Sequence, residues 1–263
     1  MKTRYDASIN GVLLSDLDER IIVTDVRENK AETSVTVHER PVTAGSFFSK
    51  SVRRSLTVTI AFVLWERDTT KRKKLLDVVN AWADGSMVTL RTNDRPGQYL
   101  RARMIDPPCI PSAMRWMDEI TIDFTAYEFP FWRQETAVSV PLSAAVQNYT
   151  FDGNGIALAD ARVTNTGSAV IKSVAFTAVC GNLSTTLSFD DLNLQQGKTL
   201  MITHTETGLL SASVDGASVL ECMTNNSSDE LEIVCGKSNA CSFSVNPSGA
   251  GAEAVLIVQG VWL

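Results

Sequence analysis

The sequence predicts a mainly β protein in two domains: residues 1–135, a β-sandwich with one α-helix, and residues 136–263, an antiparallel β-sandwich or jelly roll. Three observations support this prediction. Short segments with apolar residues at alternate positions recur along the chain, and only one segment has helical spacing. The composition also changes near residues 133–142. Residues 1–135 hold 20 Lys and Arg against 19 Asp and Glu, whereas residues 136–263 hold 4 against 11.

The clearest strand of the first domain is Ser55–Trp65. Its alternate residues from Leu56 to Leu64 are apolar, which is typical of a strand with one buried face. The opposite face becomes apolar toward the end, so we expect that end to be covered on both sides. Further strands are expected over 9–14, 21–26, 34–37, 87–92, 99–105 and 114–127.

A single helix is expected over about 69–83. Asp68 or Thr69 can cap its start, five apolar residues from Leu75 to Trp82 follow the helical period, and Gly85 can end it. Its first turn carries Lys71–Lys74, a basic run that leaves two interpretations open. It is either a solvated helix end, as charge runs usually are, or a contact for an acidic partner such as a neighbouring subunit.

The second domain is rich in Ser, Thr, Ala, Val, Asn and Gly and has no segment with a helical stripe. Its strands are expected over 157–164, 170–178, 182–189, 199–203, 209–214, 231–234, 241–245 and 254–263. Turn sequences such as Asp152–Gly155 and Asp215-Gly216 separate some of them.

Composition also excludes several classes of protein. No apolar run approaches the ~20 residues that span a bilayer, and the N-terminus does not resemble a signal peptide. No basic segment predicts nucleic-acid binding. With no secretion signal, the five cysteines are expected to be reduced, and a disulfide between Cys235 and Cys241 is the less favoured alternative.

No residue pattern predicts catalysis, a cofactor or a metal. His38 and His204 have no further ligand at a suitable spacing. The acidic residues Asp190-Asp191 and Asp229–Glu232 could be argued as a glycosidase pair, but acidic turns at sheet edges are commoner. The segment Gly236–Ser238 is better explained as a β-turn than as part of a phosphate-binding loop. We therefore predict that the protein is not an enzyme.

Several motifs of the chain together resemble the distal tail protein (Dit) family of long-tailed, non-contractile phages. In the first domain they are Tyr5–Gly11, Arg40–Ser46, Arg53–Val58, Trp82–Gly85, Tyr99–Arg103 and Phe124–Trp132. In the second domain they are Asn165–Ala169, Leu194–Leu200, Asp215-Gly216 and Gly260–Leu263.

The resemblance implies a tail-tube-like first domain and a galectin-like second domain. It further implies that six first domains form a ring that joins the tail tube to the tail-tip or hub protein, and that the ring docks receptor-binding or baseplate components. The protein would then be located at the distal end of the phage tail in the virion, and in the host cytoplasm during assembly. An alternative function is recognition of host cell-wall glycans by the second domain, although that domain holds few aromatic residues for stacking on sugars.

Overall fold

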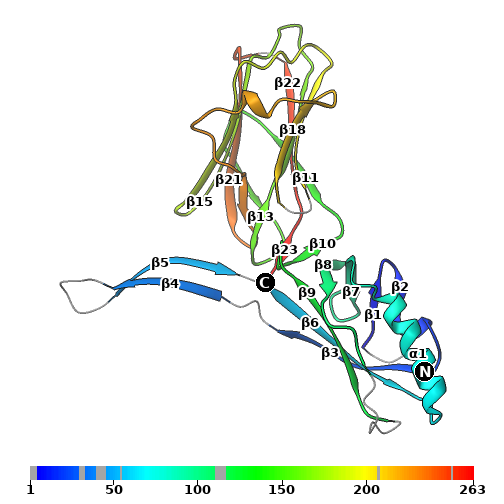
Figure 1. Ribbon diagram of the computed structural model, residues 1–263. Helices are drawn as coiled ribbons and strands as arrows, with labels where there is room; N and C mark the ends of the chain where they lie inside the picture. The colour runs from blue at the N-terminus through cyan, green and yellow to red at the C-terminus, as the bar shows by residue number, and fades with distance from the viewer. Residues whose placement is uncertain are drawn as a thin grey trace. The chain divides into compact units, whose positions relative to one another are not determined.

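The computed structural model describes residues 5–29, 33–39, 46–53, 55–109, 117–205, 208–249 and 251–263 (Figure 1). The chain divides into two compact units, one of residues 1–132 with Leu263 and the other of residues 133–262. Most of the described residues that have regular structure are in antiparallel strands, and the described part of the chain contains one α-helix. The prediction of a mainly β fold is therefore confirmed.

The first unit contains seven strands of an antiparallel sheet, in the order β2-β1-β7-β8-β9-β6-β3. In chain order these strands are β1 (Ala7–Ile9), β2 (Val12–Leu13), β3 (Ile21–Asn29), β6 (Leu56–Leu64), β7 (Met87–Thr92), β8 (Gln98–Met104) and β9 (Ile120–Ala126). The 3₁₀ helix η1 (Leu14–Asp16) follows β2, and the short strand β10 (Trp132–Gln134) lies at the boundary of the two units. Strand β6 is an interior strand next to the edge strand β3, because it pairs with β3 on one side and with β9 on the other.

The alternation in β6 places its apolar residues in the core, as expected. Leu56, Val58, Ile60, Phe62 and Leu64 are all buried, and Ala61 on the opposite face is fully buried as well. The predicted covering of both faces toward the end of this strand was wrong, because beyond Ala61 the opposite face holds Val63, which is half-buried, and Trp65, which is 50% exposed.

Helix α1 spans Thr69–Trp82, close to the expected 69–83. Asp68 caps it, because its carboxylate accepts hydrogen bonds from the backbone N–H groups of Thr70 (2.8 Å) and Lys71 (3.1 Å). These bonds lower the pKa of Asp68. At the other end, the indole of Trp82 lies edge-on to Phe124 of β9 and donates to the carbonyl of Val12. The helix is thereby held against the sheet.

Two strand predictions in the first unit were wrong. Residues 9–14 form a hairpin rather than one strand, because Asn10 and Gly11 both adopt positive φ (51° and 88°), as a tight hairpin turn requires. The strand predicted over 114–127 occupies only Ile120–Ala126, and residues 110–116 lie outside the described part of the chain.

A two-stranded hairpin follows β3. It consists of β4 (Thr33–Glu39) and β5 (Ser46–Arg53), which pair with each other and with no other described strand. The strands before and after it, β3 and β6, pair up to Asn29↔Thr57, and the hairpin pairing begins at Thr33↔Arg53. The two stretches of chain that pair as β3 and β6 therefore pair again as β4 and β5.

The second unit is a sandwich of two antiparallel sheets, as predicted (Figure 1). The first sheet has the order β11-β22-β14-β17-β18-β19, the second β12-β21-β15-β16, and β13 pairs with β20. The strands are β11 (Val138–Leu142), β12 (Gln147–Thr150), β13 (Ile156–Leu158), β14 (Asp160–Asn165), β15 (Ser173–Cys180), β16 (Leu183–Phe189), β17 (Thr199–His204), β18 (Leu210–Val214), β19 (Ala217–Ser218), β20 (Glu232–Val234), β21 (Ser238–Asn246), β22 (Ala252–Val258) and β23 (Val261–Trp262). The 3₁₀ helix η2 (Leu220–Cys222) follows β19.

Most of the predicted strands of this unit are present, with several differences. The segment 157–164 is divided between β13 and β14, which lie in different sheets, and the segment 254–263 is divided between β22 and β23. Strand β15 begins three residues later than predicted, and β21 begins three residues earlier. The core between the sheets is aliphatic and aromatic, and the ring centroids of Phe176 on β15 and Phe243 on β21 lie 5.4 Å apart.

An ion-pair network at the start of β3 makes the stability of the first unit depend on pH. Arg20 donates to both carboxylate oxygens of Asp18 (2.9 and 2.8 Å) and to Glu66 (3.0 Å). The hydrogen bonds from Arg20 lower the pKa of Asp18 to about 2. A lowered carboxylate pKa stabilises the folded state above the unfolded-state pKa, and this contribution is lost as the pH falls toward 2.

Asp18→Asn is therefore expected to reduce the free energy of unfolding at pH 7 by about 1 kcal/mol, a value reduced for the partial exposure of the pair. The difference from the wild type should shrink between pH 4 and pH 2. Urea unfolding curves at pH 7, 4 and 3 would measure it. If the difference in the free energy of unfolding between Asp18→Asn and the wild type stays constant from pH 7 to pH 3, the stabilisation by Asp18 does not come from its charge.

Candidate docking surfaces

The described residues contain no group of three or more His, Cys, Asp or Glu residues that could hold a metal ion. His204 ends strand β17, where its Nδ1 atom lies 3.0 Å from a carboxylate oxygen of Asp160, which also accepts from the His204 backbone N–H. His38 lies in β4, and its side chain is outside the described part of the structure. In the described part of the chain, no helix has the length and hydropathy of a membrane span.

The two acidic segments considered as a glycosidase pair lie at opposite ends of β16. Asp190 follows the strand and its N–H donates to Cys222, whereas the N–H of Glu232 donates to Thr185 near the start of the strand. Five residues of strand separate these points, roughly 16 Å at the usual rise. A glycosidase pair needs carboxyl groups about 5–10 Å apart. The two segments are therefore too far apart to act on one glycosidic bond.

The other motifs singled out in the sequence are turns or core residues. Gly236 has a positive φ of 77° in the turn between β20 and β21, as the β-turn interpretation of Gly236–Ser238 predicted. Asp152–Gly155 connects β12 to β13. All five cysteines are free, and burial raises the pKa of the Cys241 thiol to about 11. A thiol with a raised pKa forms little of the reactive thiolate at neutral pH.

The basic run of α1 is not a uniformly solvated helix end. Lys71, Lys73 and Lys74 are exposed, but Arg72 is only 6% exposed and its guanidinium lies 3.4 Å from the hydroxyl of Thr69. The outward side of this helix thus includes the three lysines together with the exposed Asp77 and Val78.

Two features of the first unit leave backbone groups open to a partner. Strand β3 is the last strand of its sheet and pairs only with β6 among the described strands. The β4–β5 hairpin has no third strand there. A strand at a sheet edge presents unpaired N–H and C=O groups, and an isolated hairpin is marginally stable in water.

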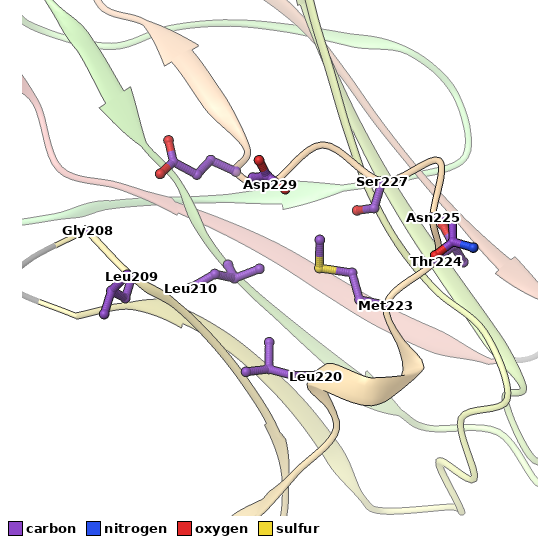
Figure 2. A pocket seen from close by; sticks show the side chains of 10 residues that line it. Gly208, Leu209, Leu210, Leu220, Met223, Thr224, Asn225, Ser227 and Asp229 are labelled. Atoms are coloured by element: carbon purple, nitrogen blue, oxygen red, sulfur yellow. The ribbon is translucent and has the colours of Figure 1, made fainter.

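The second unit carries a surface groove with a volume of about 540 Å³. Its walls come from the start of β18, from η2 and from the segment up to Glu230 (Figure 2). Figure 2 shows Leu209 and Leu210 on the β18 side, Leu220 and Met223 on the η2 side, and Asp229 across from them. The side chains of Leu209 and Leu220 are 68% and 39% exposed, whereas leucine side chains are usually buried.

The walls of this groove are fixed by hydrogen bonds to the sandwich. Segment 222–232 runs beside β16. The N–H groups of Thr224 and Ser228 donate to the carbonyls of Ser188 (3.0 Å) and Thr186 (2.6 Å). In the other direction, the N–H groups of Thr186 and Ser188 donate to the hydroxyls of Ser228 and Ser227. The exposed leucines are therefore presented on a preformed surface.

Sequence reasoning did not find this groove. It treated Asp229–Glu232 as an acidic turn and 209–214 as an ordinary strand. The signal was present but weak: two adjacent leucines directly after Gly208, at the start of a strand, where polar residues are usual.

No protein-family model matches the chain, and no curated protein matches it significantly. Among solved structures, it is similar to the Dit protein of phage SPP1, described as a paradigm of the hub adsorption apparatus in phages that infect Gram-positive bacteria. The match has 10% sequence identity, covers 98% of this chain and 99% of that chain, and has a TM-score of 0.74. Two structures of the phage p2 baseplate in its activated conformation, with Sr and with Ca, align at 9% identity over 97% of this chain and over 97% and 98% of theirs, with TM-scores of 0.42 and 0.43. The chain therefore has the fold of SPP1 Dit, in agreement with the resemblance to the distal tail proteins in its sequence.

Proposed function

We propose that this chain is a structural protein of a phage tail, with no enzymatic activity, that forms a hexameric ring at the distal end of the tail. The ring joins the tail tube to the tail-tip or hub protein and docks receptor-binding or baseplate components. The protein assembles in the host cytoplasm and resides in the virion. The observation that carries this proposal is the match to SPP1 Dit over nearly the whole of both chains.

The open backbone groups of the first unit support the assembly into a ring. A nine-residue edge strand and a hairpin without a third strand are surfaces that a second copy can cover. Because the sheet of one copy has two different edges, β2 and β3, contacts between copies can be head-to-tail, and such contacts close into rings. The acidic second unit is suited to face solvent or a partner.

The glycan-binding alternative receives less support from the structure. None of the residues that line the groove of the second unit is aromatic, so the groove offers no face on which a sugar ring can stack. A structural role therefore remains the better supported proposal.

Location in the virion tests the proposal directly. Gold-labelled antibodies against the chain are expected to bind the distal end of the tail of the phage that encodes it. Purified protein at increasing concentration should form rings in negative-stain images. Absence of the chain from purified virions would overturn the proposal, whereas monomers in dilute solution would not, because ring closure can require neighbouring tail proteins.

A variant tests the part of the β4–β5 hairpin in ring formation. Replacement of residues 33–53 by Asn-Gly removes the hairpin. We expect the fraction of ring particles to fall at least about tenfold, because the proposed contacts between the hairpin and neighbouring copies would be lost. Circular dichroism and thermal unfolding should show that the sheet still forms. Rings as abundant as in the wild type would remove the hairpin from the interface.

A further inference from the structure

We propose that the groove between β18 and η2 is a docking site for a protein segment that carries apolar side chains together with lysine or arginine. This inference rests on the proposed function, because it names the chemistry of a tail component that the second unit would hold. The argument combines the apolar floor of the groove, its acidic rim and the rigidity of its walls.

The floor supplies the apolar contact. Leu209, Leu210, Leu220 and Met223 line the groove, and the two most exposed of them would lose their contact with water when a partner binds. Removal of this exposed leucine surface from water is favourable and roughly proportional to the apolar area that the partner covers. An uncovered cluster of this kind in a polar surface is typical of an interaction site.

The rim supplies the charge. Asp229 and Glu230 line the groove, and Glu232 follows them in β20. Burial and the negative charge of Glu230 raise the pKa of Glu232, as expected where negative charges accumulate. The side chains of these three residues have no hydrogen-bond or ion-pair partner in the described part of the chain. A lysine or arginine of a partner would therefore gain ion pairs without breaking existing ones.

The basic residues of this unit do not neutralise the rim. The second unit contains five of them, Arg133, Arg162, Lys172, Lys198 and Lys237, and none lines the groove. Lys198 forms an ion pair with Asp215. The groove thus combines negative charge with apolar surface, and the complementary partner is basic and apolar.

The walls need little rearrangement for binding. Their bonds to β16 are backbone and hydroxyl hydrogen bonds, and none involves the side chain of a groove leucine or of a rim acid. A preformed site loses less conformational entropy on binding than a flexible one. Because the leucine and acidic side chains take no part in these hydrogen bonds, they can be substituted without loss of the fold.

Binding of a model peptide to the full chain tests the proposal. The probe is an amphipathic peptide of leucine and lysine, with a leucine and glutamate peptide of the same pattern for comparison, measured by fluorescence anisotropy. We expect the leucine and lysine peptide to bind at least about tenfold more tightly, and its affinity to fall with added salt. Hydrogen–deuterium exchange should show protection confined to residues 208–230.

Two groove variants and one control locate the binding. Asp229→Lys with Glu230→Lys, and separately Leu209→Ser with Leu220→Ser, should each weaken binding about tenfold or more. Asp190→Lys with Glu253→Lys makes the same change in charge at exposed positions outside the groove and should leave binding within about twofold. Equal affinity in the groove variants, or protection elsewhere, would overturn the proposal.

Self-association and the proposed function are distinguished on the same samples. If the groove instead holds the lysine-bearing helix α1 of a second copy, the groove variants will change the oligomeric state, and this outcome also overturns the proposal. If the wild type forms rings but does not bind the peptide, the groove proposal fails alone. If the peptide binds at the groove but the chain is absent from virions, the tail function fails and the groove stands.

Discussion

Gly153→Ala is expected to destabilise the second unit by about 4 kcal/mol or more, enough to unfold many domains. Gly153 has a φ of +123°, a backbone conformation that L side chains rarely adopt. A Cβ atom there would overlap the carbonyl oxygen of Val261 and lie 2.9 Å from the Cβ atom of Cys235. Both neighbours are held in place, because Val261 accepts from Asn154 and Cys235 donates to Gly155. Neither can move without breaking hydrogen bonds.

Gly181→Ala is the matched control. Gly181 also has a positive φ, +60°, but a Cβ atom there would meet nothing within 4 Å. Only the backbone strain remains, about 1 kcal/mol. Guanidinium unfolding of both variants would separate the two effects. A similar loss of stability in both would show that strain, and not the overlap with Val261, determines the need for glycine.

Phe62→Ala is expected to destabilise the first unit by about 3–5 kcal/mol, the usual cost of a large core cavity. Phe62 is fully buried in the interior strand β6, where it pairs with Val23 on one side and Ile120 on the other. Phe62→Leu retains most of the volume and should cost less than about 1.5 kcal/mol.

Unfolding curves of the two variants also test the independence of the units. If each unit has its own core, Phe62→Ala should shift one transition and Gly153→Ala another. Equal shifts of a single transition in both variants would show that the units unfold together.

The parts of the fold that were predicted correctly are those with strong local signals. Strand β6 has five alternating apolar residues, and α1 has a capping aspartate and an apolar stripe. Strands β11 and β12 were missed for different reasons. Pro141 argues against a strand unless the strand lies at an edge, and β11 is the edge of its sheet. Strand β12, Gln-Asn-Tyr-Thr, has too few apolar residues for a periodic signal.

The groove depends on tertiary structure and so could not be predicted from periodicity. Leu209 and Asp229 are twenty positions apart, and they meet only because η2 and the segment after it return along β16. Asp190 and Glu232 illustrate the opposite error. Their acidic segments suggested a pair in the sequence, but the strand between their contact points keeps them apart.

Segment 222–232, which lies beside β16, limits the ways in which a partner can bind to the second unit. It occupies the open edge of the β12-β21-β15-β16 sheet, so a partner cannot join that sheet by adding a strand there. Recognition at this end of the unit must then rely on side chains such as Leu209 and Asp229, which contribute no hydrogen bond to the framework. A few substitutions at these positions could therefore direct the same scaffold to a different partner at little cost in stability.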